Sequence, residues 1–235
     1  MNRRVEPELL DELPPDDPSA VRSRRDLRRL NFLMRHATIV ARALLESDTK
    51  PPRRVVELGA GDGTFLLAVA GKLARRWPNI EAVLLDRQNI VTGKTHAGFR
   101  ELGWTSRLAQ SDVFDWLARS REESFDCVIV NLFLHHFSAV RLRKLLSLVA
   151  ERTNCFVACE PRRAPTVRGI SGLLWLIGCN GVTRHDAVAS VCAGFVDKEL
   201  SALWPGENRW RLREKEAWLF SHCFVAQRSD GRHAR

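Results

Sequence analysis

The sequence predicts an α/β fold in which a doubly wound, mostly parallel sheet is followed by an antiparallel strand pair. Three observations lead to this fold class. Short apolar segments alternate with amphipathic ones from residue 54 to residue 159. The apolar segments are almost continuously hydrophobic, which is typical of parallel strands that are buried on both faces. Residues 210–228 then contain two strand patterns with only a short link between them.

The central part of the chain reads as a series of strand–helix units. The first strand is expected at residues 54–58, where Val55 and Val56 lead into a glycine-rich turn. The other apolar segments are expected to be strands at residues 80–85, 105–111, 125–131 and 155–159. Helices are expected between them at residues 64–76, 90–102, 113–119 and 138–152. This alternation is the pattern that builds a parallel sheet.

The N-terminal segment divides into two parts. Residues 1–20 are acidic and rich in proline, so we expect a mobile arm. From residue 19 to residue 46 apolar residues recur at helical spacing, which predicts one long helix or two short ones, with Ser19 as the N-cap. Residues 48–52 end the helical pattern. The first strand is therefore preceded by a predicted helical lid.

The pattern changes after residue 159. Residues 168–177 and 186–193 predict helices without a strand between them. The strand pair in residues 210–228 is linked at Ala217 and Trp218, which indicates a hairpin. We therefore expect a small helical cap, followed by an antiparallel end of the sheet.

The composition fits one main domain with a cap. The chain has 235 residues, of which 45% are hydrophobic, and this is enough for a full core. We expect residues 1–50 to form the arm and lid, and residues 51–235 to form the main domain with a cap insertion near residues 162–195. No apolar segment approaches the about 20 residues of a membrane-spanning helix, and the first 20 residues lack the pattern of a signal peptide. The expectation is a cytoplasmic protein without a membrane span.

Charge and cysteine content bear on the partners. The net charge is +9, and arginines cluster in residues 22–29, which indicates either a solvated helix face or an anionic partner such as a nucleic acid. The six cysteines form no C-x-x-C pair and no paired Cys/His spacing. This pattern favours reduced thiols in the core over zinc sites or disulfides. We therefore expect no metal site, and a nucleic acid is the less favoured partner.

The stretch RRVVELGAGDGTF, residues 53–65, holds the most informative motif. Gly59, Gly61 and Gly63 follow the first strand, where a doubly wound sheet binds its ligands and where glycine allows close backbone approach. The third glycine comes one position earlier than in the dinucleotide fingerprint G-x-G-x-x-G. Asp62 would repel a pyrophosphate in this turn, or would cap the following helix. The turn therefore favours a ligand without phosphate over a dinucleotide.

Two further acids end or follow the next strands. Asp86 ends the second strand, where a carboxylate accepts hydrogen bonds from ribose hydroxyls. Asp112 follows the third strand beside Val113 and Phe114, and an acid with apolar neighbours suits an adenine. The three acids together predict a cationic nucleoside ligand. S-adenosylmethionine, with its sulfonium and ammonium groups, fits this description.

At these residues the sequence resembles the class I S-adenosylmethionine-dependent methyltransferases. The motifs are VVELGAGDGTF, LLDRQ, QSDVFDW, FDCVIVNLFLHHF and FVACEPRR, in the order of that family over roughly residues 50–160. The strand pair at residues 210–228 matches the family's last hairpin. The resemblance is to the small-molecule, ubiquinone/menaquinone-methyltransferase-like type. It implies a Rossmann-like sheet of seven strands with the last one inserted antiparallel, and S-adenosyl-L-methionine as the cofactor.

The resemblance also implies which residues hold the cofactor. Glu57 starts the motif, and Gly59, Ala60 and Gly61 would lie against the methionine part. Asp86 would hold the ribose. The other implied residues are Arg87 and Gln88 near the adenine, Asp112 and Val113 at the adenine edge, and Asn131 and Leu132 on the methionine and substrate side.

Three histidines are candidates for a catalytic base. Methyl transfer to oxygen needs alignment, exclusion of water and a base whose pKa lies near neutrality, for which histidine is suited. His135 and His136 follow the fourth strand, at the edge where the methyl group should point, and His136 is the first candidate. His185, beside Asp186 in the segment GCNGVTRHDA, could bind or deprotonate an acceptor under the cap. Helix capping, packing and a plain polar loop are the alternatives for these residues.

The favoured function is O-methylation of a small aromatic acceptor of phenolic or polyketide-like type. Alternatives are C-methylation of a quinol-like ring, methylation of RNA or protein, and a cofactor-binding partner subunit without activity of its own. Asn131 and Leu132 are not followed by the Asn/Asp-Pro-Pro-aromatic signature of amino-group methylation on bases, which counts against a nucleic-acid substrate.

Overall fold

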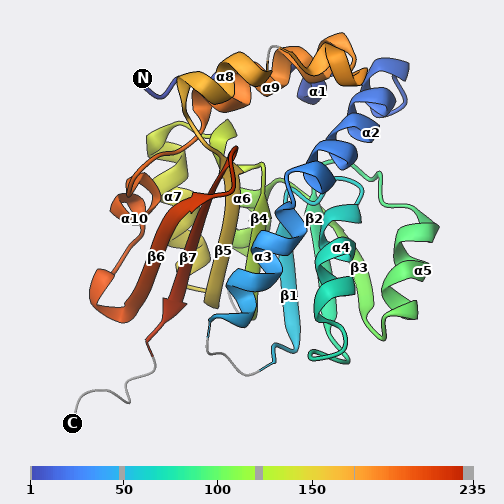
Figure 1. Cartoon of the computed structure of the whole chain (residues 1–235). Coiled ribbons are helices and arrows are strands. Elements are labelled where there is room, and N and C mark those ends of the chain that lie inside the picture. The colour runs from blue at the N-terminus through green and yellow to red at the C-terminus, as the bar shows by residue number, and fades with distance from the viewer. Residues whose placement is uncertain (1, 48–50, 120–123, 172, 230–235) are drawn as a thin grey trace.

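The computed structural model describes residues 2–47, 51–119, 124–171 and 173–229. Its centre is one sheet of seven strands in the order β3-β2-β1-β4-β5-β7-β6 (Figure 1). The strands are β1 (Arg54–Leu58), β2 (Glu81–Asp86), β3 (Thr105–Gln110), β4 (Phe125–Asn131), β5 (Thr153–Pro161), β6 (Trp210–Ala217) and β7 (Ser221–Arg228). The order reverses beside β1, so that the ends of β1 and β4 meet at the switch point where ligands bind in such folds.

Strand direction follows the predicted pattern. Strands β1 to β5 pair in parallel, for instance with Glu57 opposite Leu84 of β2 and Ile129 of β4. Strand β7 is antiparallel to both β5 and β6. The predicted fold class, a doubly wound and mostly parallel sheet with an antiparallel terminal hairpin, is confirmed.

Helices cover both faces of the sheet, as continuous apolar strands require. One face carries α3 (His36–Leu45), α4 (Thr64–Leu73) and α5 (Gly93–Glu101), and the other carries α6 (Val113–Arg119), α7 (Ala139–Ala150) and α10 (Glu199–Leu203) (Figure 1). Successive strand residues alternate between the two cores: Val55 packs in the first and Val56 in the second. The sheet is therefore a rigid platform whose carboxyl edge presents the loops after β1 to β4.

The N-terminal region forms a short helix and then two longer ones. They are α1 (Leu9–Glu12), α2 (Pro18–Leu33) and α3. Arg35 adopts a left-handed backbone with φ of 57°, which separates α2 from α3. The N-cap of α2 is Asp17, whose carboxylate accepts hydrogen bonds from the amides of Ser19 and Ala20. The predicted cap at Ser19 is thus wrong by two residues, because Pro18 already occupies the first helical position.

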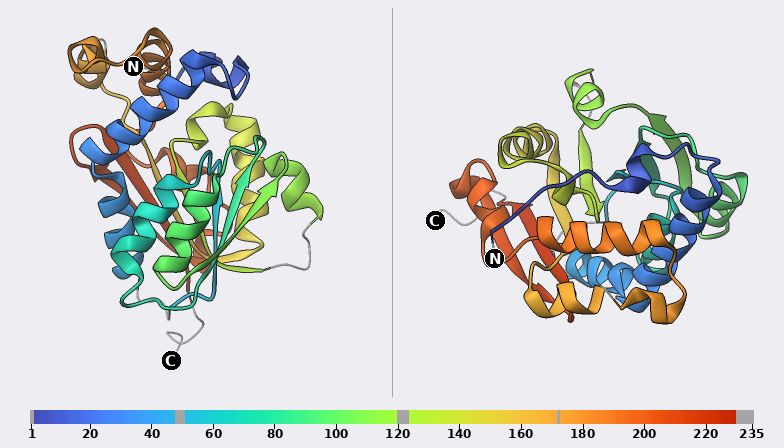
Figure 2. Two further views of the ribbon diagram at one scale, coloured as in Figure 1. Left: turned by 90° about the vertical axis from the view of Figure 1, so that its right-hand side faces the viewer. Right: turned by 90° about the horizontal axis from the view of Figure 1, so that it is seen from above.

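A helical layer lies across the carboxyl edge of the sheet. It consists of α1, the first turns of α2, α8 (Pro165–Ser171), the short η2 (Leu174–Ile177) and α9 (Gly181–Ala193) (Figures 1 and 2). The helix expected at residues 168–177 is divided into α8 and η2, and residue 172 lies outside the described part. Helix α9 begins five residues before the expected start at residue 186, because Asn180 caps it through the amide of Thr183.

The predicted mobile arm is instead seated on this layer. The amide of Arg4 donates to the carbonyl of Cys192, and the guanidinium of Arg3 donates to the carbonyls of Ala193 and Phe137. The acidic and proline-rich composition gave no sign of these contacts, because all of them are with residues more than 130 positions away.

The remaining elements are two short helical turns, η1 (Leu134–His136) after β4 and η3 (Glu207–Arg209) before β6. The six cysteines are free thiols, and all but Cys192 are buried, as expected. Within the described residues, every helix is too short or too polar to cross a bilayer.

Candidate functional site

A cavity of about 410 Å³ opens at the carboxyl edge of the sheet, beneath the helical layer. This volume is in the usual range for small-molecule sites. All eleven predicted cofactor residues line it: Glu57, Gly59, Ala60, Gly61, Asp86, Arg87, Gln88, Asp112, Val113, Asn131 and Leu132. The structure thus brings residues from four strand ends to one place, although their assignment to parts of a cofactor remains a prediction.

The glycine-rich turn forms the floor of this cavity. The amides of Gly59 and Ala60 both donate to the carbonyl of Leu85, which ties the turn to the end of β2. Gly59 has a φ of 70°, and a Cβ there would lie 2.4 Å from the ring of Phe133. Glycine is therefore required at this position for two reasons: the backbone is left-handed, and the ring of Phe133 leaves no room for a side chain.

Three carboxylates lie together around the turn. The side chain of Glu57 is buried, and burial raises its pKa well above the ordinary value, with further contributions from Asp62 and Asp86. Asp86 accepts hydrogen bonds from the amides of Gly61 and Gln88, at 2.8 Å each. This end of the cavity is therefore electrostatically prepared for a positive charge rather than for a phosphate.

Asp62 makes contacts on both sides of the turn, but the N-cap position of α4 is Gly63 and not Asp62 as considered from the sequence. One of its oxygens accepts hydrogen bonds from the amide and hydroxyl of Thr64, at the start of α4. The other forms an ion pair of 2.5 Å with Arg28 of α2, and both residues line the cavity. Helix α2 is therefore held against the glycine-rich turn.

The adenine end of the predicted site lies at the start of α6. One oxygen of Asp112 accepts a hydrogen bond of 2.8 Å from the amide of Phe114. Val113 is buried, while Asp112 is partly exposed and lines the cavity. A carboxylate and an apolar side chain thus face the same space at the third strand end.

Two buried oxygen atoms at the cavity lack a partner in the described part of the chain. They are Oε2 of Glu57 and Oδ1 of Asn131. The Asn131 amide nitrogen donates to Asn31 of α2, so that its oxygen is left as the free acceptor. Buried acceptors without donors are unfavourable, and an ammonium group supplies N–H donors and a positive charge together. The donor and acceptor set therefore fits the amino-acid end of S-adenosylmethionine.

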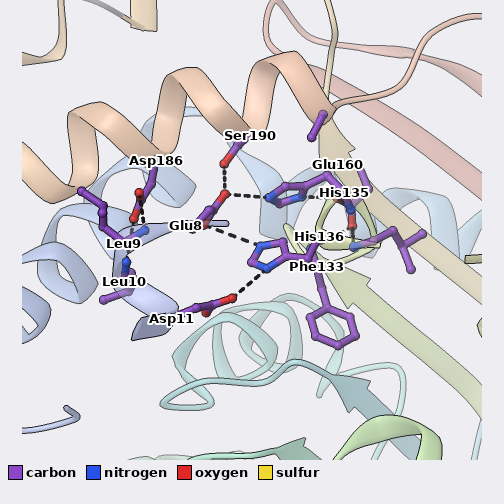
Figure 3. Close-up of polar contacts among 12 residues, drawn as sticks. Glu8, Leu9, Leu10, Asp11, Phe133, His135, His136, Glu160, Asp186 and Ser190 are labelled. Atoms are coloured by element: carbon purple, nitrogen blue, oxygen red, sulfur yellow. Dashed lines mark hydrogen bonds and ion pairs between the residues drawn. The ribbon is translucent and has the colours of Figure 1, made fainter. Parts of the chain in front are cut away.

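The histidine pair after β4, His135 and His136, also lines the cavity, and Figure 3 shows its polar contacts. His135 is buried, with Nδ1 2.8 Å from Glu160 and Nε2 3.1 Å from Glu8. Burial alone would lower the pKa of His135, but the hydrogen bonds to these two carboxylates raise it to about 9. The Glu160 carboxylate also accepts from the amides of Phe133 and Leu134, which fixes the turn that carries the pair.

His136 is the more accessible member of the pair. Its Nδ1 lies 3.1 Å from Asp11, and its Nε2 lies 3.6 Å from the second oxygen of Glu8. Glu8 and Asp11 also line the cavity, and both come from the N-terminal arm. Sequence reasoning missed these two acids, because nothing in an isolated acidic arm indicates that it returns to the fourth strand.

The third predicted histidine lies elsewhere. His185 is about half exposed, does not line the cavity, and places Nδ1 3.0 Å from Asp186. The Asp186 carboxylate accepts hydrogen bonds from the amides of Leu9 and Leu10, so that it holds α1 (Figure 3). The structure therefore brings His135 and His136 together with the predicted cofactor residues but does not bring His185 to them.

Sequence comparison matches part of the chain to a known family. Residues 55–154, from the start of β1 to the start of β5, match the methyltransferase domain family. The matched segment contains every predicted cofactor residue. A comparison with curated proteins gave no match.

Comparison with solved structures shows the same fold at low sequence identity. The plantazolicin methyltransferase BpumL in complex with SAH is 12% identical, with a TM-score of 0.61, over 91% of this chain and 92% of that one. An O-methyltransferase family protein from Burkholderia thailandensis is 19% identical, with a TM-score of 0.53, over 85% of this chain and 58% of that one. Magnesium protoporphyrin IX methyltransferase from Synechocystis PCC 6803 with bound SAH is 16% identical, with a TM-score of 0.53, over 83% of each chain.

Proposed function

We propose that this chain is an S-adenosylmethionine-dependent methyltransferase that methylates an oxygen atom of a small acceptor molecule, and the domain match over residues 55–154 and the fold support this proposal. The observation that carries the proposal is that one cavity is lined both by two unpaired acceptor oxygens, of Glu57 and Asn131, and by the histidine pair His135 and His136. An aromatic, phenolic acceptor is the favoured class, as the sequence analysis expects.

The layer of helices over the cavity supports a small acceptor over a macromolecule. Residues from α1, α2 and α9 line it together with the strand ends, so that the histidine pair lies beneath a layer of helices. In the arginine cluster of α2, Arg28 pairs with Asp62, and Arg29 contacts Asp26 and the carbonyl of Ile177. Arg28 and Arg29 therefore have partners within the chain, in agreement with the solvated helix face considered from the sequence.

Two of the proteins with a similar fold are named for small-molecule acceptors, plantazolicin and magnesium protoporphyrin IX. The plantazolicin enzyme is 12% identical to this chain and the magnesium protoporphyrin enzyme 16%, so that the likeness concerns the fold and does not identify the acceptor of this chain. The acceptor class proposed for this chain therefore rests on its own cavity.

We assign the cofactor end as follows. Asp86 would accept from the ribose hydroxyls, Asp112 and Val113 would hold the adenine, and Glu57 and Asn131 would accept from the ammonium group. When bound, S-adenosylmethionine supplies a methyl carbon that bonds to the acceptor oxygen while the carbon–sulfur bond breaks and sulfur keeps the bonding pair. The protein's task is alignment and exclusion of water.

The histidine pair is assigned to the acceptor end. Both ring nitrogens of His135 face carboxylates within hydrogen-bonding distance, so that we propose a positioning role for it. His136, on the partly exposed side of the pair, would contact the acceptor hydroxyl directly. His185 is left out of the proposed chemistry because it lies off the cavity.

The test is a screen with a methyl-labelled donor. Phenols, quinols and transfer RNA are incubated separately with the full chain, and the product is analysed for the position of the label. We expect label on the oxygen of a phenol, and a strong loss of that label with His136→Ala. Label on a ring carbon of a quinol would favour the C-methylation alternative. Label found in transfer RNA alone would contradict the proposal.

A further inference from the structure

The cluster of Glu8, His135 and His136 has the composition of a metal site, which the sequence analysis did not expect. One ligand atom from each residue can be chosen so that all three lie within 4.8 Å of one another. Two imidazoles and one carboxylate form a common donor set for divalent transition metals, whereas Mg²⁺ and Ca²⁺ prefer oxygen ligands alone.

The arrangement within the cluster is more specific than its composition. Glu8 presents one carboxylate oxygen to each ring, at 3.1 Å from Nε2 of His135 and 3.6 Å from Nε2 of His136. Ligands at zinc bond lengths of about 2.0–2.1 Å in a tetrahedron lie about 3.3 Å apart. The two nitrogen–oxygen distances are therefore already close to the spacing that a bound ion would impose, and one ligand atom from each residue lies within 4.8 Å of the others.

The opposite nitrogen of each ring is oriented by a carboxylate. Nδ1 of His135 is 2.8 Å from the fully buried Glu160, and Nδ1 of His136 is 3.1 Å from Asp11 (Figure 3). A histidine that binds a metal usually donates its other N–H to such an outer acceptor, which fixes the ring and its tautomer. Both histidines have this arrangement, with Nε2 directed to the shared acid.

We propose that Glu8, His135 and His136 bind one divalent transition-metal ion of the zinc type. Three protein ligands leave a coordination position open, as in catalytic rather than structural zinc sites. All three residues line the cavity that also contains the glycine-rich turn and Asn131. A ligand in the cavity could therefore reach an ion held by these three residues.

The ion would complete the acceptor end of the site, a consequence that rests on the proposed function. A phenolic oxygen bound at the open position would release its proton to solvent, because a metal ion lowers the pKa of a coordinated hydroxyl. His136 would then act as a ligand of the metal and not as a free base. Glu8 would link the arm to this chemistry, since an arm displaced from the cavity would remove one ligand.

The experiment titrates the full chain with the metal alone. The protein is treated with a chelator, dialysed and titrated with Zn²⁺ by calorimetry, and with Co²⁺ by visible absorption, in the absence of donor and acceptor. We expect one ion per chain, and Co²⁺ bands typical of a site with nitrogen and oxygen ligands. His136→Ala and Glu8→Gln should each weaken binding by more than about 100-fold, since loss of an outer partner already costs about 10- to 100-fold.

Two further variants make the result specific. Asp11→Asn keeps all three ligands and alters only an outer partner, so that we expect metal affinity to fall by about 10-fold. His185→Ala removes a histidine outside the cluster and should bind the ion as the unmodified chain does. Thermal unfolding of each apo variant shows that the fold is retained.

The metal proposal and the proposed function can fail separately. Failure of the unmodified chain to bind Zn²⁺ or Co²⁺ would overturn the metal site. Binding by His136→Ala and Glu8→Gln that is as tight as binding by the unmodified chain would also overturn it. Metal binding by the cluster in a chain that labels only transfer RNA would keep the metal site and overturn the proposed acceptor.

Discussion

Gly59 and Gly71 are two glycines with opposite structural requirements. Alanine at residue 59 would have an unfavourable positive φ and would bring its Cβ to 2.4 Å from Phe133. Alanine at residue 71, in the exposed face of α4, meets nothing within 4 Å. We expect Gly59→Ala to lower the free energy of unfolding by at least about 1–2 kcal/mol and Gly71→Ala to raise it by about 1 kcal/mol. Urea unfolding of both variants measures this, and equal effects of the two would contradict the account of the turn.

Asp86 is the single residue that most directly tests the cofactor end. Its carboxylate supports the turn through Gly61, and we propose that it also accepts from a ribose. Asp86→Asn removes a charged acceptor, so that calorimetry should show S-adenosylhomocysteine binding weakened by about 10- to 100-fold. Asp115→Asn, an exposed acid on α6 outside the cavity, is the matched control. Equal affinity of the two variants would remove Asp86 from the site.

At the scale of elements, His36 joins the start of α3 to the sheet. Its ring is buried and contacts Asn31 of α2 and the hydroxyl of Ser221 of β7, at 2.9 and 2.8 Å. Burial lowers its pKa from 6.5 to about 4. Between pH 6.5 and pH 4, His36 is therefore mostly protonated in the unfolded chain and mostly neutral in the folded chain. The free energy of unfolding consequently falls as the pH falls from 6.5 toward 4. Between pH 7 and pH 5 the loss from this residue should be about 2 kcal/mol.

The measurement for His36 is urea unfolding at pH 7 and pH 5. The His36→Gln variant should lose less stability over this interval than the unmodified chain does. His185→Ala, which removes a half-exposed histidine, should show the unmodified pH dependence. The burial argument is wrong if the slope is the same with and without His36.

The Asp186 carboxylate is one of the groups that hold the arm in place. Asp186 accepts from the amides of Leu9 and Leu10, at 2.8 and 3.0 Å, and therefore holds α1 on α9. Asp186→Ala should increase amide hydrogen exchange in residues 2–12 by about 10-fold or more and leave the exchange of β1 and β4 unchanged. His185→Ala leaves both amide bonds in place and serves as the control. Unchanged protection of the arm in Asp186→Ala would show that other contacts suffice to hold it.

Elements governed by local pattern could be predicted from the sequence. Strands β1 and β4 have the expected bounds because their apolar runs end at polar or glycine-rich turns. The residues predicted to hold the cofactor line one cavity for the same reason, since they lie at or just after the ends of strands. Helix α10 and the start of α9 could not be predicted from the sequence, because a short helix and a cap at Asn180 leave little periodicity to detect.

At the scale of the whole molecule, long-range contacts determine where the N-terminal arm lies, which could not be predicted from the sequence. Glu8 and Asp11 reach His135 and His136 across more than 120 residues of chain. No spacing rule connects an acidic arm to a histidine pair so far away, and the prediction of a mobile arm was wrong for this reason. The carboxyl edge of the sheet, the helical lid and the cap could be predicted from periodicity, whereas the seat of the arm on the histidine pair required the three-dimensional structure.

The central claim is that one cavity holds the cofactor between Glu57, Asp86 and Asp112, with the sulfur of the cofactor directed to the histidine pair. A crystal structure of the chain with S-adenosylhomocysteine tests it most directly. We predict the ribose at Asp86, the adenine at Asp112 and the amino group at the unpaired oxygens of Glu57 and Asn131. A ligand bound outside this cavity, or one whose sulfur points away from His136, would contradict the account.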